Sequence, residues 1–268
     1  MMIRQPAVAG SFYPANPAGL IEQVAGFLPE NAAMHPVKGL IVPHAGYVYS
    51  GSVAGKTIAE AQIPEQVILI GPNHQGTGPA IAVSGADAWQ TPLGQVAVAG
   101  DLREALVSHI PELSVDDRAH AHEHSLEVML PFLQSRQTQL RIVPIVLGAL
   151  SLEDCLQLGH ALAVVLRECK DEVLLLASSD MNHFSNAEVT EQLDSLAIRA
   201  MTDYDPQGLY RVVRENRISM CGVLPAVTVL QAARELGADR CRLVAYSHSG
   251  KVNGDDSRVV GYAGLTIE

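Results

Sequence analysis

The chain has 268 residues, 48% of them hydrophobic, and its 18 basic and 29 acidic residues give a net charge of −11. It has no lysine or arginine cluster, few aromatic residues and no apolar run near the about 20 residues of a membrane span, which argues against nucleic-acid binding and membrane insertion. The N-terminus lacks a signal-peptide core and the four cysteines form no CxxC pair, so we expect a cytoplasmic protein without structural disulfides.

Short apolar runs alternate with amphipathic segments along the chain. The apolar runs, bounded by Gly, Pro or Asp, predict strands. They cover 38–43, 66–71, 80–84, 95–99, 140–147, 172–177, 240–247 and 258–266. The amphipathic segments predict helices over 17–29, 51–62, 101–110, 124–135, 152–168, 187–203, 206–216 and 224–236.

This alternation predicts an α/β fold, with a largely parallel central sheet covered by helices on both faces. We expect a single three-layer α/β/α domain spanning residues 1–268. The last two strands are close in sequence and predict an antiparallel hairpin around the turn SGKVNGDDS. In sheets of this kind, ligands collect at the carboxyl ends of the parallel strands.

Three of the predicted strands are followed by a histidine. The first strand ends at Pro43 and is followed by His44, the second leads into Pro-Asn-His74, and the strand 172–177 leads into SSDMNH, which ends at His183. Each histidine alone could be an ordinary loop residue. Together, at one sheet edge, three imidazoles could bind a metal, or two could bind it while the third transfers protons.

Cys221 is a fourth candidate, because it lies just before the predicted helix 224–236. The helix dipole should lower the pKa of this thiol and favour the thiolate that binds metals. The alternative is that Cys221 is a small buried apolar residue, as we expect for the other cysteines.

The segment HAHEHSLEVMLPF adds further candidates. Its histidines precede or cap a helix, and we expect His120 and His122 to be solvated. Glu123 and His124, at the helix entry, could line the site.

Several motifs in fixed order resemble the Memo family, whose prokaryotic members are called AmmeMemoRadiSam system protein B. They are AGSFYP, VPHAGYVYSG, ILIGPNH, EHSLEVMLPF, IVPIVLG, SSDMNHF and MCGVLPA, and the resemblance runs from about Ala9 to Leu265. It implies a fold similar to that of the class III extradiol ring-cleaving dioxygenases, which hold non-haem Fe(II) with two histidines and a glutamate.

The resemblance also implies roles for individual residues. His44 and His74 would be the two histidine ligands, and Cys221 would stand where the dioxygenases supply a carboxylate. His183 would be the acid/base residue. From its position two residues before Asn182, we expect Asp180 to be the carboxylate that fixes the tautomer of His183. Asp180 or Glu123 would orient one of the histidines as a hydrogen-bond partner that does not itself bind the metal.

The cysteine is a departure from the dioxygenase ligand set. A thiolate is softer than a carboxylate and can itself be oxidised, so copper or zinc would suit the site as well as Fe(II). We therefore expect a metal-dependent oxidoreductase related to these dioxygenases, of unknown substrate. The alternative is a non-enzymatic binding or copper- or iron-handling protein that uses the same pocket.

The resemblance further places Phe12 and Tyr13 near the pocket mouth, and we count His124, from its place at the helix entry, among the residues that could line the pocket. An aromatic pair there could contact a small aromatic molecule or a peptide, although Phe12 could instead anchor the N-terminus to the core. Family association also implies a radical S-adenosylmethionine protein as a functional partner.

Overall fold

The computed structural model describes residues 1–29 and 32–268. Within them, twelve strands form one mixed sheet, whose main path runs in the order β1-β5-β6-β8-β3-β9-β2-β12-β10. The strands are β1 (Ile3–Arg4), β2 (Gly39–Val42), β3 (Gln66–Pro72), β4 (Ile81–Val83), β5 (Ala88–Thr91), β6 (Gly94–Val98), β7 (Ser114–Val115), β8 (Arg141–Leu147), β9 (Val173–Ser178), β10 (His183–Ser185), β11 (Cys241–His248) and β12 (Val259–Ile267).

The centre of the sheet is parallel. Strands β6, β8, β3, β9 and β2 lie side by side in the same direction, with Ile68 of β3 opposite Leu175 of β9, and Ile41 of β2 opposite Ala177. Strand β12 joins this group antiparallel to β2, and β4 pairs antiparallel with β8. The parallel strands all present their carboxyl ends at one edge of the sheet.

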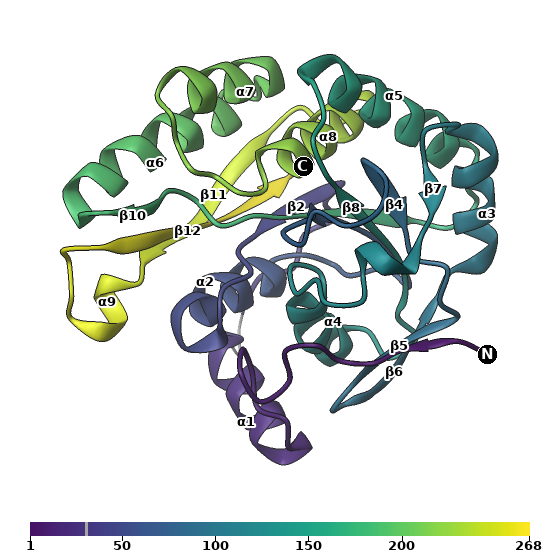
Figure 1. Ribbon diagram of the computed structural model, residues 1–268, viewed down its shortest axis with the longest axis horizontal. Coiled ribbons are helices and arrows are strands. Elements are labelled where there is room, and N and C mark those ends of the chain that lie inside the picture. Colours follow the sequence, from purple (N-terminus) through teal and green to yellow (C-terminus); the bar gives the residue numbers. More distant parts are fainter. Residues whose placement is uncertain (30–31) are drawn as a thin grey trace.

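Helices cover both faces of the sheet (Figure 1). Alternate strand residues point to opposite faces. Ile41 accordingly belongs to a core cluster with residues of α3, α5, α6, α7 and α8, while Leu40 and Val42 belong to a second cluster with residues of α1, α2 and α4. The helices are α1 (Pro17–Phe27), α2 (Tyr47–Ala59), α3 (Gly100–His109), α4 (Leu130–Arg136), α5 (Leu152–Glu168), α6 (Ala187–Thr202), α7 (Pro206–Glu215), α8 (Val223–Glu235) and α9 (Gly250–Asn253).

The predicted three-layer α/β/α architecture is confirmed, and β11 and β12 form the predicted antiparallel hairpin. The prediction was wrong at the start of the helix 124–135, because α4 begins only at Leu130, after a 3₁₀ turn at Glu127–Met129. Pro131 lacks an N–H and therefore suits the first turn of a helix better than its interior. The described residues form no helix long and apolar enough to cross a membrane.

A buried ion pair ties the N-terminal strand to the core. Arg4 bonds the carboxylate of Glu127, and neither side chain is more than 6% exposed. Glu127 also accepts hydrogen bonds from the backbone N–H groups of Ala7 and Val8 and from the hydroxyl of Tyr13, at 2.6–3.0 Å. Because so many donors converge on one carboxylate, removal of Glu127 leaves a buried charge and several donors unpaired.

We predict that Glu127→Ala lowers the free energy of unfolding by about 3–5 kcal/mol, as is typical for breaking a buried ion pair. Urea denaturation followed by circular dichroism measures this. The exposed pair of Arg199 and Asp203 in α6 provides the control, and Asp203→Ala should leave stability nearly unchanged. Equal effects of the two substitutions would contradict the role of the buried pair.

Candidate metal centre

Three adjacent parallel strands, in the order β3-β9-β2, deliver the candidate ligands to one edge of the sheet. His44 follows the end of β2, and His74 follows the end of β3. Cys221 lies directly before the N-cap residue of α8, Gly222, whose backbone packs against the end of β9. A Cβ at Gly222 would lie 2.5 Å from the Cβ of Ser179, so this close approach requires glycine.

The three side chains meet at this edge. One ligand atom from each of His44, His74 and Cys221 lies within 4.8 Å of the others. The Sγ of Cys221 is 3.3 Å from Nε2 of His44, and the two imidazole rings are 5.2 Å apart between centroids. This is the convergence predicted for His44 and His74 from their strand ends, and for Cys221 from the family resemblance.

His44 is buried, and its ring orientation is set by Ser178. The hydroxyl of Ser178 donates to the carbonyl of Ser125 at 2.6 Å, so its oxygen accepts from Nδ1 of His44, also at 2.6 Å. The Nδ1 therefore carries the proton, and Nε2 presents its lone pair toward Cys221. Burial, followed by the neighbouring imidazoles of His124 and His74, lowers the pKa of His44 well below its usual value and keeps it neutral.

His74 is held by Glu123, a buried carboxylate. The Nδ1 of His74 lies 2.9 Å from Oε1 of Glu123, and the His74 backbone N–H donates to the other carboxylate oxygen. Burial alone would raise the pKa of Glu123, but the bonds from His74 and the N–H of Ser125 bring it down to about 2. An ionised Glu123 therefore accepts from Nδ1 and leaves Nε2 of His74 free.

The predicted low pKa of Cys221 is wrong for the metal-free protein. Burial raises the pKa of this thiol far above its usual value, and the nearby carboxylate of Asp180 adds to the shift. The N–H groups at the start of α8 do not outweigh these effects, since desolvation opposes any isolated buried charge. The thiol is therefore protonated at neutral pH.

His183 lies beside the cluster but outside the group of three converging ligand atoms. Its Nδ1 is 2.8 Å from the carbonyl oxygen of Ser219, an acceptor, so Nδ1 carries the proton. The prediction that Asp180 fixes this tautomer is wrong, because the Asp180 carboxylate accepts from the backbone N–H of His44 at 2.8 Å. Asp180 shapes the His44 loop instead, and its burial raises its pKa to about 7.

His124 and Phe12 flank the cluster. The ring of His124 stacks on His74 with a centroid separation of 4.7 Å, and the Phe12 ring lies 4.7 Å from that of His124 in a tilted arrangement. Tyr13 was wrongly predicted at the pocket mouth, since it is buried and its hydroxyl donates to Glu127. His120 was wrongly predicted to be solvated. It is fully buried, and its Nε2 lies 3.2 Å from the carbonyl of Ala82.

Two serines of this site were not singled out from the sequence. Ser178 holds His44, and Ser219 holds His183. Ser178 stands at the polar end of an otherwise apolar strand, which is a usable signal. Ser219 faces the His183 ring with its backbone carbonyl, a group that every residue has and that no sequence pattern identifies.

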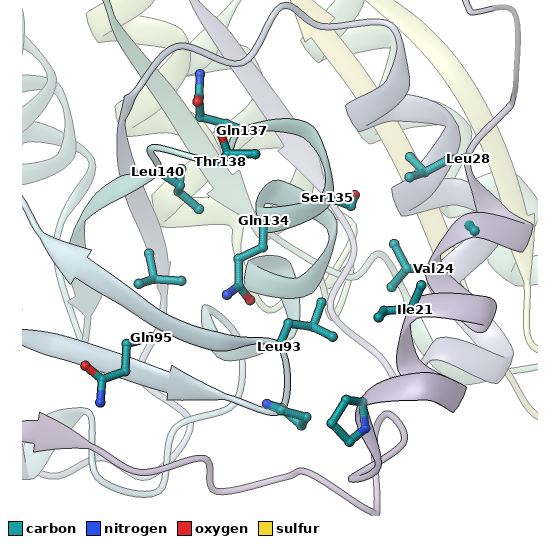
Figure 2. A pocket seen from close by; sticks show the side chains of 14 residues that line it. Ile21, Val24, Leu28, Leu93, Gln95, Gln134, Ser135, Gln137, Thr138 and Leu140 are labelled. Carbon is teal, nitrogen blue, oxygen red and sulfur yellow. The ribbon is translucent and has the colours of Figure 1, made fainter.

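A separate cavity of about 680 Å³ lies between α1, α4 and the turn joining β5 to β6 (Figure 2). Leu28 and Ile21 line one side, and Leu93 and Gln134 approach from the other. None of its lining residues is titratable or a cysteine. This cavity therefore offers no acid–base or thiol ligand chemistry.

Comparison with known proteins agrees with the motifs. A family model described as Memo-like protein matches residues 4–266. The chain belongs to the Memo family. A MEMO1 family protein of Aquifex aeolicus is 42% identical over 269 residues, covering 99% of both chains. Another, from Methanothermobacter thermautotrophicus, is 40% identical over 277 residues and covers 99% of this chain and 100% of the relative.

A solved structure supports the fold of this Memo family member. The crystal structure of an uncharacterised protein from Escherichia coli K12 superposes with a TM-score of 0.59, covering 87% of this chain and 100% of that one. At 14% sequence identity the likeness concerns the fold alone. It is consistent with the class III extradiol dioxygenase-like fold that the sequence motifs implied.

The raised pKa of Cys221 leads to a prediction about thiol reactivity. Cys169 and Cys221 are both partly exposed, and burial raises the pKa of both thiols, but much further at Cys221. In the metal-free protein Cys169 should therefore be alkylated before Cys221, because only thiolates react rapidly. Mass spectrometry after brief iodoacetamide treatment locates the label. The fully buried Cys155 serves as the slow internal reference, and labelling of Cys221 first would contradict the pKa assignment.

Proposed function

We propose that this protein binds one metal ion through Nε2 of His44, Nε2 of His74 and Sγ of Cys221. The observation that carries the proposal is the orientation of the two imidazoles. In each, Nδ1 is bonded to an oxygen from a neighbouring element, Ser178 or Glu123. Such a partner on one nitrogen is the usual arrangement of histidines that give the other nitrogen to a metal.

The donor set fits a transition metal. Two imidazole nitrogens and one sulfur suit Fe(II), Cu or Zn, and three protein ligands leave coordination positions open. Among these metals we propose Fe(II), in a dioxygenase-like oxidoreductase. When bound, the metal would supply Lewis-acid and redox chemistry.

In this oxidoreductase, His183 would accept or donate the proton that is transferred during the reaction. Burial lowers the pKa of His183, so the ring is neutral at pH 7. Because Nδ1 donates to Ser219, Nε2 is the nitrogen that can accept a proton. His124, stacked on His74, and Phe12 beside His124 would contact the body of a small aromatic or peptide ligand.

A second function is favoured by the cysteine itself. A thiol in place of a carboxylate is a soft ligand that favours Cu(I) or Zn over hard metals. The site would then bind or transfer metal without turnover. The identity of the bound metal distinguishes the two functions, since stoichiometric Fe(II) supports the oxidoreductase and Cu(I) supports metal handling.

We predict one equivalent of metal in protein purified without oxygen, measured by elemental analysis. His44→Ala, His74→Ala and Cys221→Ala should each weaken metal binding by more than about 100-fold, because each removes a direct ligand and not only an outer partner. His183→Ala should retain the metal.

The control for these variants is His160→Ala, since the ring of His160 is largely exposed and pairs with Glu235 on the protein surface. This variant should bind metal like the original chain. Full metal retention in Cys221→Ala would contradict the proposed ligand set, and loss of metal in His183→Ala would make that histidine a fourth ligand.

Glu123 gives a second test of the same site. We predict that Glu123→Ala weakens metal binding by about 10–100-fold, because His74 loses the acceptor that orients its ring. Competition with a chromogenic chelator measures the affinity. Glu112→Ala is the matched control at an exposed glutamate, and an unchanged affinity in Glu123→Ala would show that His74 needs no orienting partner.

A further inference from the structure

The segment that carries His183 is bent in an unusual way. The pairing of β10 with β12 shifts register between His183 and Ser185, and Phe184 between them has a φ of 66°. A left-handed backbone at a bulky residue is strained and persists only where its surroundings impose it. Some group must therefore hold this bend in place.

Asp194 of α6 is one such group. Its carboxylate is fully buried, and Oδ1 accepts from the backbone N–H of Asn182 at 2.8 Å, while Oδ2 accepts from the hydroxyl of Tyr246 at 2.8 Å. The space that Asp194 occupies exists because residue 261 is glycine, since a Cβ there would collide with Oδ2. Burial raises the pKa of Asp194 to about 6, so at pH 8 it is ionised and accepts both bonds.

Asn182 transmits this constraint to His183 through Ser219. The side-chain oxygen of Asn182 accepts from the backbone N–H and the hydroxyl of Ser219, at 3.2 and 3.0 Å. Ser219 then holds His183 twice, because its hydroxyl oxygen accepts the His183 backbone N–H at 2.7 Å and its carbonyl lies 2.8 Å from Nδ1. Asp194 is thus connected to the His183 ring by hydrogen bonds to Asn182, from Asn182 to Ser219 and from Ser219 to His183, which the covalent bonds within Asn182 and Ser219 join.

We infer that Asp194 is a positioning residue for His183, which acts through Asn182 and Ser219 to hold the imidazole as its Nδ1–H tautomer with Nε2 free. This inference rests on the proposed function for its catalytic meaning, because only a proton-transfer role makes the tautomer of His183 matter. It assigns to Asp194 the task that the sequence suggested for Asp180.

The test reads the tautomer directly, by ¹⁵N NMR of histidine-labelled, metal-free protein at pH 8, with the His183 signals assigned from His183→Gln. We expect a single Nδ1–H form in the original chain. Asp194→Ala should lose it and show the Nε2–H form, which a free imidazole prefers. Asp194→Asn keeps an acceptor for the N–H of Asn182 and should restore the Nδ1–H form. Glu188→Ala, at an exposed position of the same helix, should change nothing.

If Asp194→Ala does not fold, Tyr246→Phe provides the test. This variant removes one of the two hydrogen bonds that hold the Asp194 carboxylate. We expect this variant to gain part of the Nε2–H form. An unchanged Nδ1–H form in folded Asp194→Ala, or in Tyr246→Phe if the alanine variant does not fold, would overturn the inference. Metal titration of the same proteins tests the proposed function separately. If the original chain binds no metal, the proposed function is wrong, but the measured tautomer of His183 still decides the role of Asp194.

Discussion

The parallel pairing of β3, β9 and β2 is the constraint on which the site depends. Parallel neighbours must end at the same edge, so the residues just beyond their carboxyl ends are brought together wherever they lie in the sequence. His44 and His74 follow two of these ends, and the third end provides the surface on which Gly222 seats Cys221. Strand order brings the cluster together, while Asp180 and the close approach of Gly222 set the local backbone of His44 and Cys221.

In each histidine of the site, an oxygen acceptor bonded to one ring nitrogen determines that the other nitrogen is free. Ser178 and Glu123 accept from Nδ1 of the two candidate ligands, and the carbonyl of Ser219 accepts from Nδ1 of His183. All three histidines consequently keep Nε2 for chemistry. The acceptors differ in charge, from a carboxylate to a neutral hydroxyl and a carbonyl, so the three imidazoles meet different local fields.

Much of this arrangement can be predicted from the sequence, because the relevant signals are local. Continuous apolar runs identify β2, β3 and β9, and the histidines follow these runs within a few residues. The errors concern tertiary surroundings. Tyr13 lies beside Phe12 in the chain, yet its hydroxyl turns inward because Glu127, over one hundred residues away, supplies a buried acceptor. Likewise, the partner of Asp180 proved to be a backbone N–H, which every residue except proline offers.

The sequence separation of the ligands has a consequence for how the protein is made. Cys221 is 177 residues from His44, and Arg4 is 123 residues from Glu127. The candidate metal site and the buried Arg4–Glu127 ion pair therefore both form late in folding. Contacts of this range slow folding, because chain entropy is lost before they form. During synthesis the two histidines emerge long before Cys221. The three side chains of the cluster can therefore meet only once most of the sheet has been made.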